Sequence, residues 1–244
     1  MGFRAPRVGP TLRSPSAPAL AAATATIASA GLAVLTALVA AGWEPLLGLD
    51  RRLSGAARGY GMAHPFWVEG WRLVTHLGDS LTLVLVAIAA VALLLRLGRR
   101  RAAVLVPLAA LTTQLASMAV REPLARARPV DGFVVTHSWA FPSGHTVHSA
   151  TAALVAVQLL WPHLEHRARW ITATLAGVLA LSVGISRVML LAHWPSDVLG
   201  GWLLALAVVP ALFSASAAVR RRHPPPARSP TAPHMPQPSS TPPR

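Results

Sequence analysis

The chain has 244 residues, of which 53% are hydrophobic and 12% are charged, whereas charged residues make up roughly 25% of a soluble domain. It contains no cysteine, which excludes disulfide frameworks, thiolate nucleophiles and cysteine-based zinc sites. All 22 basic residues are arginine, which excludes P-loop lysines and Schiff-base chemistry. The net charge of +14 would suggest a nucleic-acid partner in a soluble protein, but these arginines lie at the ends of apolar segments. We therefore expect a membrane protein with no nucleic-acid partner.

Six apolar segments, taken in chain order, predict the fold. Each is free of Arg, Asp and Glu over roughly the 17 to 25 residues that a membrane-spanning helix needs, although the second and the fifth are short and need neighbouring residues to complete the span. They cover residues 19–43, 80–95, 102–120, 143–162, 170–186 and 198–219. They predict an all-α integral membrane bundle of six transmembrane helices in one domain, 19–219. Residues 1–18 are expected to be a cytoplasmic segment, and the Pro-, Ser- and Arg-rich residues 220–244 a disordered cytoplasmic tail.

The segment 44–79, between the first two apolar segments, is too polar to span a membrane. Its Trp67 and Trp71 predict an amphipathic stretch at the outer interface. With the N-terminus inside the cell, 14 arginines fall on the cytoplasmic side and 8 on the outer side, as the excess of basic residues in cytoplasmic loops requires. We therefore expect a protein of the cytoplasmic membrane with both termini in the cytoplasm.

Three clusters of polar residues interrupt the apolar pattern, each at the end of a predicted helix. Residues 121–129 leave the third helix, residues 142–145 open the fourth, and residues 186–197 join the fifth to the sixth. In a bundle of six spans the loops that hold these clusters lie on one face, opposite the termini. The sequence therefore predicts an active site at the outer-face ends of the helices.

The residues of these clusters are suited to binding an anion. A helix that opens with Pro-Ser143-Gly144 leaves backbone N–H groups unpaired at the positive end of its dipole, and the glycine allows close approach. Arg121, Arg128 and Arg187 would supply planar guanidinium donors to the remaining oxygens. This combination predicts a phosphate-binding site.

Two histidines accompany the predicted phosphate site. Asp197 follows His193 by four residues, and His145 begins the fourth helix. A carboxylate that accepts a proton from one imidazole nitrogen leaves the other nitrogen free as a nucleophile and stabilises the cation formed on attack. The pair His193 and Asp197 is therefore a candidate nucleophile with its orienting group.

The three clusters resemble the motifs of the type 2 phosphatidic acid phosphatase superfamily, membrane phosphatases that share a site with vanadium haloperoxidases. The family pattern is K-x6-R-P, then P-S-G-H, then S-R-x5-H-x3-D. The second and third motifs are matched in full, and the first has Arg121 in place of the lysine. The resemblance covers about residues 70–215.

This resemblance implies a mechanism. His193 would attack phosphorus to form a phosphohistidine, with Asp197 orienting it, and His145 would protonate the departing oxygen and then activate water. The phosphate oxygens would be held by the remaining motif residues, Arg121, Arg128, Ser143, Gly144 and Arg187. The arginines neutralise charge, so no metal or cofactor is expected.

The expected function is hydrolysis of a lipid phosphate or diphosphate in the bilayer. The motifs contact only phosphate, so polyprenyl diphosphate, phosphatidic acid and phosphatidylglycerol phosphate all remain open as substrates. A vanadate-dependent haloperoxidase is one alternative, and a non-catalytic transporter or structural membrane protein is another. Structural interpretations of single residues also stand: Ser-Gly-His is a common helix cap, and His148 and His137 suit a packed and a loop-surface role.

Overall fold

A computed structural model describes residues 17–222, and all regular structure within this range is helical. The helices are α1 (Ala17–Ala40), α2 (Glu44–Ala63), α3 (Pro65–His76), α4 (Ser80–Arg96), α5 (Arg100–Leu124), α6 (Gly144–Leu160), the 3₁₀ turn η1 (Trp161–His163), α7 (His166–Met189) and α8 (Pro195–Arg222). The all-α class predicted from the sequence is thus confirmed for this range. The terminal segments, expected to be a cytoplasmic N-terminus and a disordered tail, lie almost entirely outside the described residues.

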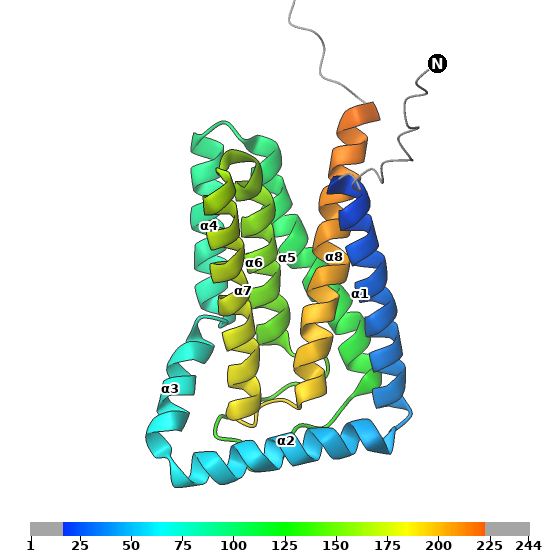
Figure 1. Ribbon diagram of the computed structural model, residues 1–244, viewed down its shortest axis with the longest axis vertical. Helices are drawn as coiled ribbons and strands as arrows, with labels where there is room; N and C mark the ends of the chain where they lie inside the picture. Colours follow the sequence, from blue (N-terminus) through cyan, green and yellow to red (C-terminus); the bar gives the residue numbers. More distant parts are fainter. Residues whose placement is uncertain (1–16, 223–244) are drawn as a thin grey trace, which may run out of the picture.

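The long helices lie side by side as a bundle (Figure 1). Helices α1, α4, α5, α6, α7 and α8 run alternately in opposite directions, α2 lies across one end, and α3 leads from α2 to α4. The start of α1 and the end of α8 lie together at the opposite end of the bundle. Every apolar segment predicted from the sequence therefore corresponds to one helix of the bundle.

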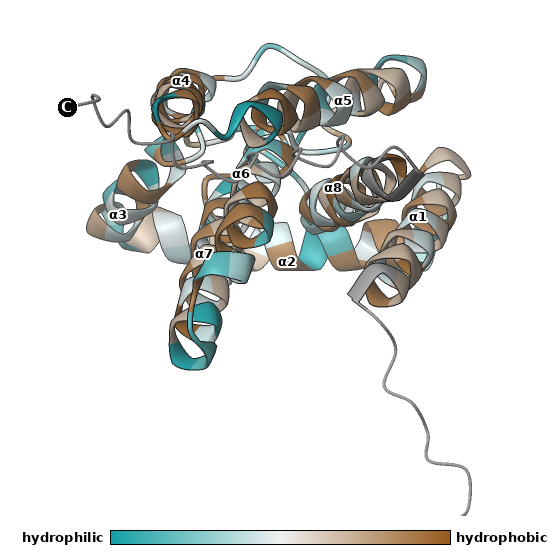
Figure 2. Cartoon of the chain, turned by 90° about the horizontal axis from the view of Figure 1, so that it is seen from above, coloured by the Kyte–Doolittle hydropathy of each residue, from teal (hydrophilic) through white to brown (hydrophobic). Residues whose placement is uncertain are grey.

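Five helical stretches are long and apolar enough to cross a membrane. These are Ala19–Ala40, Pro65–Arg96, Arg100–Leu124, His166–Met189 and Pro195–Val219. Helix α6 has 17 residues, fewer than these five, so the prediction of six spans is met in part. Hydrophobic residues cover much of the bundle along the helix lengths (Figure 2), and α4 has no buried residue at all. Such exposed apolar faces fit a lipid environment.

Helix α2 lies across the end of the bundle and buries one face against it. Its buried positions, Asp50, Ser54, Ala57 and Gly61, recur every three or four residues and so lie on one face. That face contacts the end of the bundle, and hydrophilic and hydrophobic residues alternate along the helix (Figure 2). The two polar members of this face, Asp50 and Ser54, are only 2% and 5% exposed, which indicates that α2 covers polar groups beneath it.

Small residues bring α8 close to the start of α6. A Cβ on Gly200 would lie 2.7 Å from the ring of Phe141, and one on Gly201 would lie 2.8 Å from Thr146 Cβ. Larger side chains at these positions would push α8 away from the Pro-Ser-Gly-His turn. The backbone N–H of Ser143 also donates to the carbonyl of Asp197 over 3.0 Å. Packing therefore joins the second and third motifs.

Candidate active site

A cavity of about 550 Å³ lies at the end of the bundle where α3 meets α4. Six of the eight predicted site residues line it: Arg121, Arg128, Gly144, His145, Arg187 and His193. The other two, Ser143 and Asp197, are fully buried behind its wall. Other lining residues come from the α3–α4 turn and from residues 134–138 of the loop before α6. Residues of all three motifs, as far apart in the sequence as Arg121 and His193, thus meet in one cavity.

The first turn of α6 faces the cavity with free amides. The first amide of the helix that bonds within it is Val147 N, which donates to Ser143 O over 2.9 Å, so the three preceding N–H groups have no intrahelical acceptor. The Arg121 guanidinium lies beside them, and its Nη2 donates to Pro142 O (3.0 Å) and Ser117 Oγ (2.9 Å). A Cβ on Gly144 would come within 3.3 Å of this Nη2. Glycine therefore leaves room for Arg121 at the helix start.

Ser143 occupies the N-cap position but makes no cap hydrogen bond with its side chain. Its Oγ accepts a hydrogen bond of 3.0 Å from Thr146 Oγ1, inside the protein. The sequence predicted that this hydroxyl would contact phosphate; in the structure Ser143 is buried and is not among the residues that line the cavity. The Ser143 backbone, by contrast, connects the motifs through its bond to Asp197.

Two of the arginines keep donors free. Arg187 is 4% exposed, and its Nη1 donates to Thr75 Oγ1 over 2.6 Å. Its Nε and the Nε of Arg121 are buried and have no acceptor among the described residues. A buried donor without a partner is costly to keep, whereas an anion beside it would accept its hydrogen bond. These guanidinium groups are consequently suited to holding an oxyanion.

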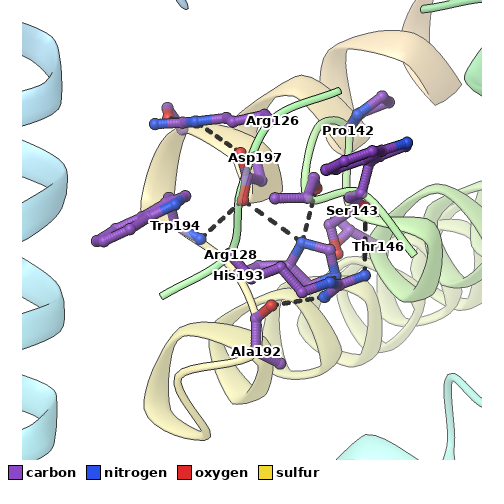
Figure 3. A network of polar contacts seen from close by, with 12 residues as sticks. Arg126, Arg128, Pro142, Ser143, Thr146, Ala192, His193, Trp194 and Asp197 are labelled. Atoms are coloured by element: carbon purple, nitrogen blue, oxygen red, sulfur yellow. Dashed lines mark hydrogen bonds and ion pairs between the residues drawn. The ribbon is translucent and has the colours of Figure 1, made fainter. Parts of the chain in front are cut away.

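Figure 3 shows how His193 is held. Its Nδ1 lies 2.8 Å from Ala140 O and 3.5 Å from Asp197 Oδ2, while its Nε2 lies 2.9 Å from Arg128 Nη1. Ala140 O and the Asp197 carboxylate can only accept hydrogen bonds, so the proton is on Nδ1 and Nε2 keeps its lone pair. The orienting contact predicted for Asp197 is therefore shared with a backbone carbonyl, which is nearer.

His193 lies in the turn between α7 and α8, and its environment controls its charge. Burial lowers the pKa of His193 to about 4, although Asp197 acts in the opposite direction. Burial also lowers the pKa of Arg128, but a guanidinium stays charged in proteins. At neutral pH the site therefore presents an uncharged imidazole beside a cation, as a nitrogen nucleophile requires.

Asp197 is fixed by a buried network that the sequence did not reveal. Its Oδ1 accepts from Arg126 Nη1 over 2.5 Å, and its Oδ2 accepts from Trp194 N over 2.8 Å. Arg126 Nη2 in turn lies 2.7 Å from Asp50 Oδ2, and Ser196 N donates to Asp50 Oδ1 over 2.9 Å. Arg126 looked like part of the spacer in R-x6-R-P, and Asp50 like one polar residue of an amphipathic helix. Only the helical spacing of Asp50 with other buried positions could have indicated burial.

The remaining polar candidates have simpler surroundings. His148 Nε2 lies 2.8 Å from Gln114 Oε1 in the inner part of the cavity, His137 lies on the cavity wall, and Asp131 pairs with Arg58 over 3.0 Å. Within residues 17–222, no group of three or more His, Asp or Glu is arranged to hold a metal ion.

A known protein family matches the part of the chain that holds the three motifs. Residues 116–221 match the PAP2 superfamily, and this range includes all three motifs. These residues belong to the PAP2 superfamily. The resemblance predicted from the motif spacing is therefore confirmed. The PAP2 residues include α6, α7, almost all of α8 and the C-terminal end of α5.

Relatives of the PAP2 segment carry phosphatase names. Phosphatidylglycerophosphatase B of Escherichia coli K12 is 39% identical over 95 residues, covering 37% of this chain and 36% of its own length. Its namesake in Bacillus subtilis 168 is 38% identical over 99 residues, covering 39% and 48%. The chain thus aligns with between a third and a half of the length of these curated relatives.

A solved structure extends the likeness beyond the PAP2 segment. The crystal structure of a transmembrane PAP2-type phosphatidylglycerolphosphate phosphatase from Bacillus subtilis superposes with a TM-score of 0.71 and 28% identity. The match covers 79% of this chain and 97% of that one. The chain is therefore a membrane protein with a transmembrane PAP2 fold.

Proposed function

We propose that the protein is an integral membrane lipid phosphatase that works through a phosphohistidine on His193. The observation that carries this proposal is the state of the imidazole: Nδ1 is held by Ala140 O, and the Nε2 lone pair faces a cavity bordered by arginines. The names of the relatives support the same chemistry.

In the first half-reaction, His193 Nε2 forms a bond to phosphorus while the bond from phosphorus to the alcohol oxygen breaks. Arg128 Nη1, now 2.9 Å from Nε2, would transfer its hydrogen bond to a phosphate oxygen. Arg121, Arg187 and the free amides of α6 would bind the other oxygens as negative charge develops on them. His145 gives its proton to the departing alcohol.

In the second half-reaction, His145 accepts a proton from water as the water oxygen attacks phosphorus. The bond between phosphorus and Nε2 breaks, and His193 returns to a neutral imidazole with its proton on Nδ1. The low pKa of the free imidazole makes it a good leaving group in this step. The fully buried Asp197 stabilises the cationic phosphohistidine between the two steps.

Among lipid phosphates, we propose phosphatidylglycerol phosphate as the substrate. Its support is the name shared by the relatives, which are phosphatidylglycerophosphatases. A cavity at the ends of the helices suits a headgroup that reaches the interface while its chains stay in the bilayer. Phosphatidic acid and polyprenyl diphosphate carry the same terminal phosphate and are the competing outcomes.

Phosphate release from a panel of lipids tests this function. The purified protein in detergent should release phosphate from phosphatidylglycerol phosphate with a higher kcat/KM than from phosphatidic acid or polyprenyl diphosphate. Because arginines neutralise the phosphate in this mechanism, activity should persist in EDTA. No release from any member of the panel would contradict a lipid phosphatase, and magnesium-dependent activity would contradict the arginine-based mechanism.

We further propose six spans, cytoplasmic termini and an extracytoplasmic site in the cytoplasmic membrane. By sequence, most arginines precede α1, follow α8 or lie in the α4–α5 and α6–α7 connections. These segments belong to the end of the bundle where α1 begins and α8 ends, and this excess supports the orientation. The chain has no native cysteine, so Val130→Cys and Arg100→Cys give single labelling sites at opposite ends of the bundle. A membrane-impermeant maleimide should label intact cells at residue 130, which is 77% exposed, but not at residue 100. The reverse pattern would put the site in the cytoplasm.

A further inference from the structure

The turn between α3 and α4 forms one wall of the cavity, although it precedes the PAP2 segment 116–221. In the last turn of α3, Thr75 Oγ1 accepts the hydrogen bond of 2.6 Å from Arg187 Nη1. A Cβ on Gly78 would lie 2.5 Å from Val183 Cγ1, so glycine lets the turn pack directly against α7. Both the backbone and the side chains of this turn are thus fitted to the site.

Asp79 is the acidic residue of this turn, and it contacts His145. Its Oδ1 lies 3.0 Å from His145 Nε2, and its Oδ2 lies 2.7 Å from His76 Nδ1. The side chains of Asp79 and His145 are 38% and 28% exposed, so the pair lies at the cavity wall. An ionised carboxylate only accepts hydrogen bonds, so Nε2 of His145 carries a proton. The nitrogen left to exchange a proton with substrate is then Nδ1.

We propose that Asp79 is a positioning residue, which holds His145 through Nε2 so that Nδ1 performs the proton transfers of the reaction. This inference rests on the proposed phosphatase function. His76 fixes the second carboxylate oxygen and thereby the direction of the first. Asp79 thus orients His145, in the same way that Ala140 O and Asp197 orient His193.

The carboxylate stabilises the charge that His145 acquires. To act as the general acid of the first step, His145 carries protons on both nitrogens, with Asp79 at Nε2. Its Nδ1 proton passes to the alcohol oxygen as the ester bond breaks, which leaves a neutral imidazole. In the second step Nδ1 takes one proton from the attacking water. Asp79 itself gains and loses no proton in the cycle.

Paired substrates and variants test this role. A lipid phosphate has an alkoxide leaving group that needs a proton, whereas p-nitrophenyl phosphate releases a phenolate that does not. The variant Asp79→Asn keeps the shape of the side chain but removes its charge. Asp131→Asn is the matched control. Asp131 is also a carboxylate, it is paired with Arg58, and the side chain of Asp131 is 71% exposed.

With the lipid phosphate, Asp79→Asn should lower steady-state turnover by a factor of about 10–10², a part of the roughly 10²–10⁴ that general acid–base catalysis supplies. With p-nitrophenyl phosphate, the pre-steady-state burst of nitrophenolate should keep its wild-type rate, while the following steady rate falls because water activation still needs His145. Asp131→Asn should match wild type with both substrates. Equal losses in burst and steady rate, or wild-type behaviour with both substrates, would overturn the positioning role.

A spectroscopic measurement separates this inference from the function on which it rests. In protein labelled with ¹⁵N-histidine, His145 is assigned by its loss in His145→Gln. Its Nε2 should be protonated in wild type, and both nitrogen resonances should shift in Asp79→Ala. Unchanged resonances would refute the pairing whether or not a substrate is cleaved. A wild-type protein that cleaves no phosphate ester would instead overturn the phosphatase function itself.

Discussion

His193→Ala is expected to abolish steady-state phosphate release and the trapping of an acid-labile phosphoprotein. The substitution removes Nε2, the atom proposed to bond phosphorus, whereas the arginines and the α6 amides remain in place to bind phosphate. Removing the nucleophile of a comparable catalytic unit reduces kcat by a factor on the order of 10⁶. Rapid quenching with radiolabelled lipid phosphate, followed by an acid-stability test of the labelled protein, measures both effects.

Two further variants make the His193 result specific. His163→Ala changes a histidine in η1. This turn lies between α6 and α7, at the end of the bundle opposite α2, so the variant should retain wild-type turnover. His145→Ala should still form the phosphoenzyme from p-nitrophenyl phosphate, because the phenolate leaves without a proton, but should hydrolyse it slowly. A His193→Ala protein that elutes normally in detergent and turns over within tenfold of wild type would refute the phosphohistidine mechanism.

The lengths of the apolar segments and the positions of the charged residues predicted the helices. A helix in contact with lipid must be apolar along its length, and this requirement can be checked for each segment separately. The apolar segment 80–95 corresponds to the helix Ser80–Arg96, and the segment 198–219 corresponds to most of the helix Pro195–Arg222. Helix α6, which corresponds to the fourth apolar segment, has 17 residues. Its sequence was expected to continue to residue 162, but Pro162 instead lies in the short 3₁₀ turn that follows. Local hydropathy therefore predicted the existence of the helices better than their ends.

The motifs supplied six of the residues that line the cavity, because each motif begins or ends a helix at the same end of the bundle. They did not predict Arg126, Asp50 or Asp79. Arg126 meets Asp50 across 76 positions of the sequence, and Asp79 meets His145 across 66. Contacts between such distant positions depend on how α2 and the α3–α4 turn pack against the bundle, and no single-sequence pattern encodes that packing.

The buried position of Arg126 gives it a different importance from the other paired arginines. Its side chain is 11% exposed, and it bridges Asp50 and Asp197, which are 2% and 0% exposed. The Arg58–Asp131 pair connects positions nearly as far apart in the sequence, but its side chains are 42% and 71% exposed. Solvent can replace a lost partner in the second pair but not in the first. The two arginines therefore form a matched comparison between a buried and an exposed ion pair.

Arg126→Met is expected to lower the free energy of unfolding by about 3–5 kcal/mol, because it leaves two buried carboxylates uncompensated. For a chain of this size that corresponds to a fall of about 6–20 °C in Tm. Arg58→Met, in contrast, should cost about 0–1 kcal/mol. Adding Asp50→Asn to Arg126→Met should restore part of the loss, since one stranded charge is removed. Thermal unfolding of the four proteins in one detergent measures these differences, and equal Tm values for Arg126→Met and Arg58→Met would contradict the role assigned to the buried network.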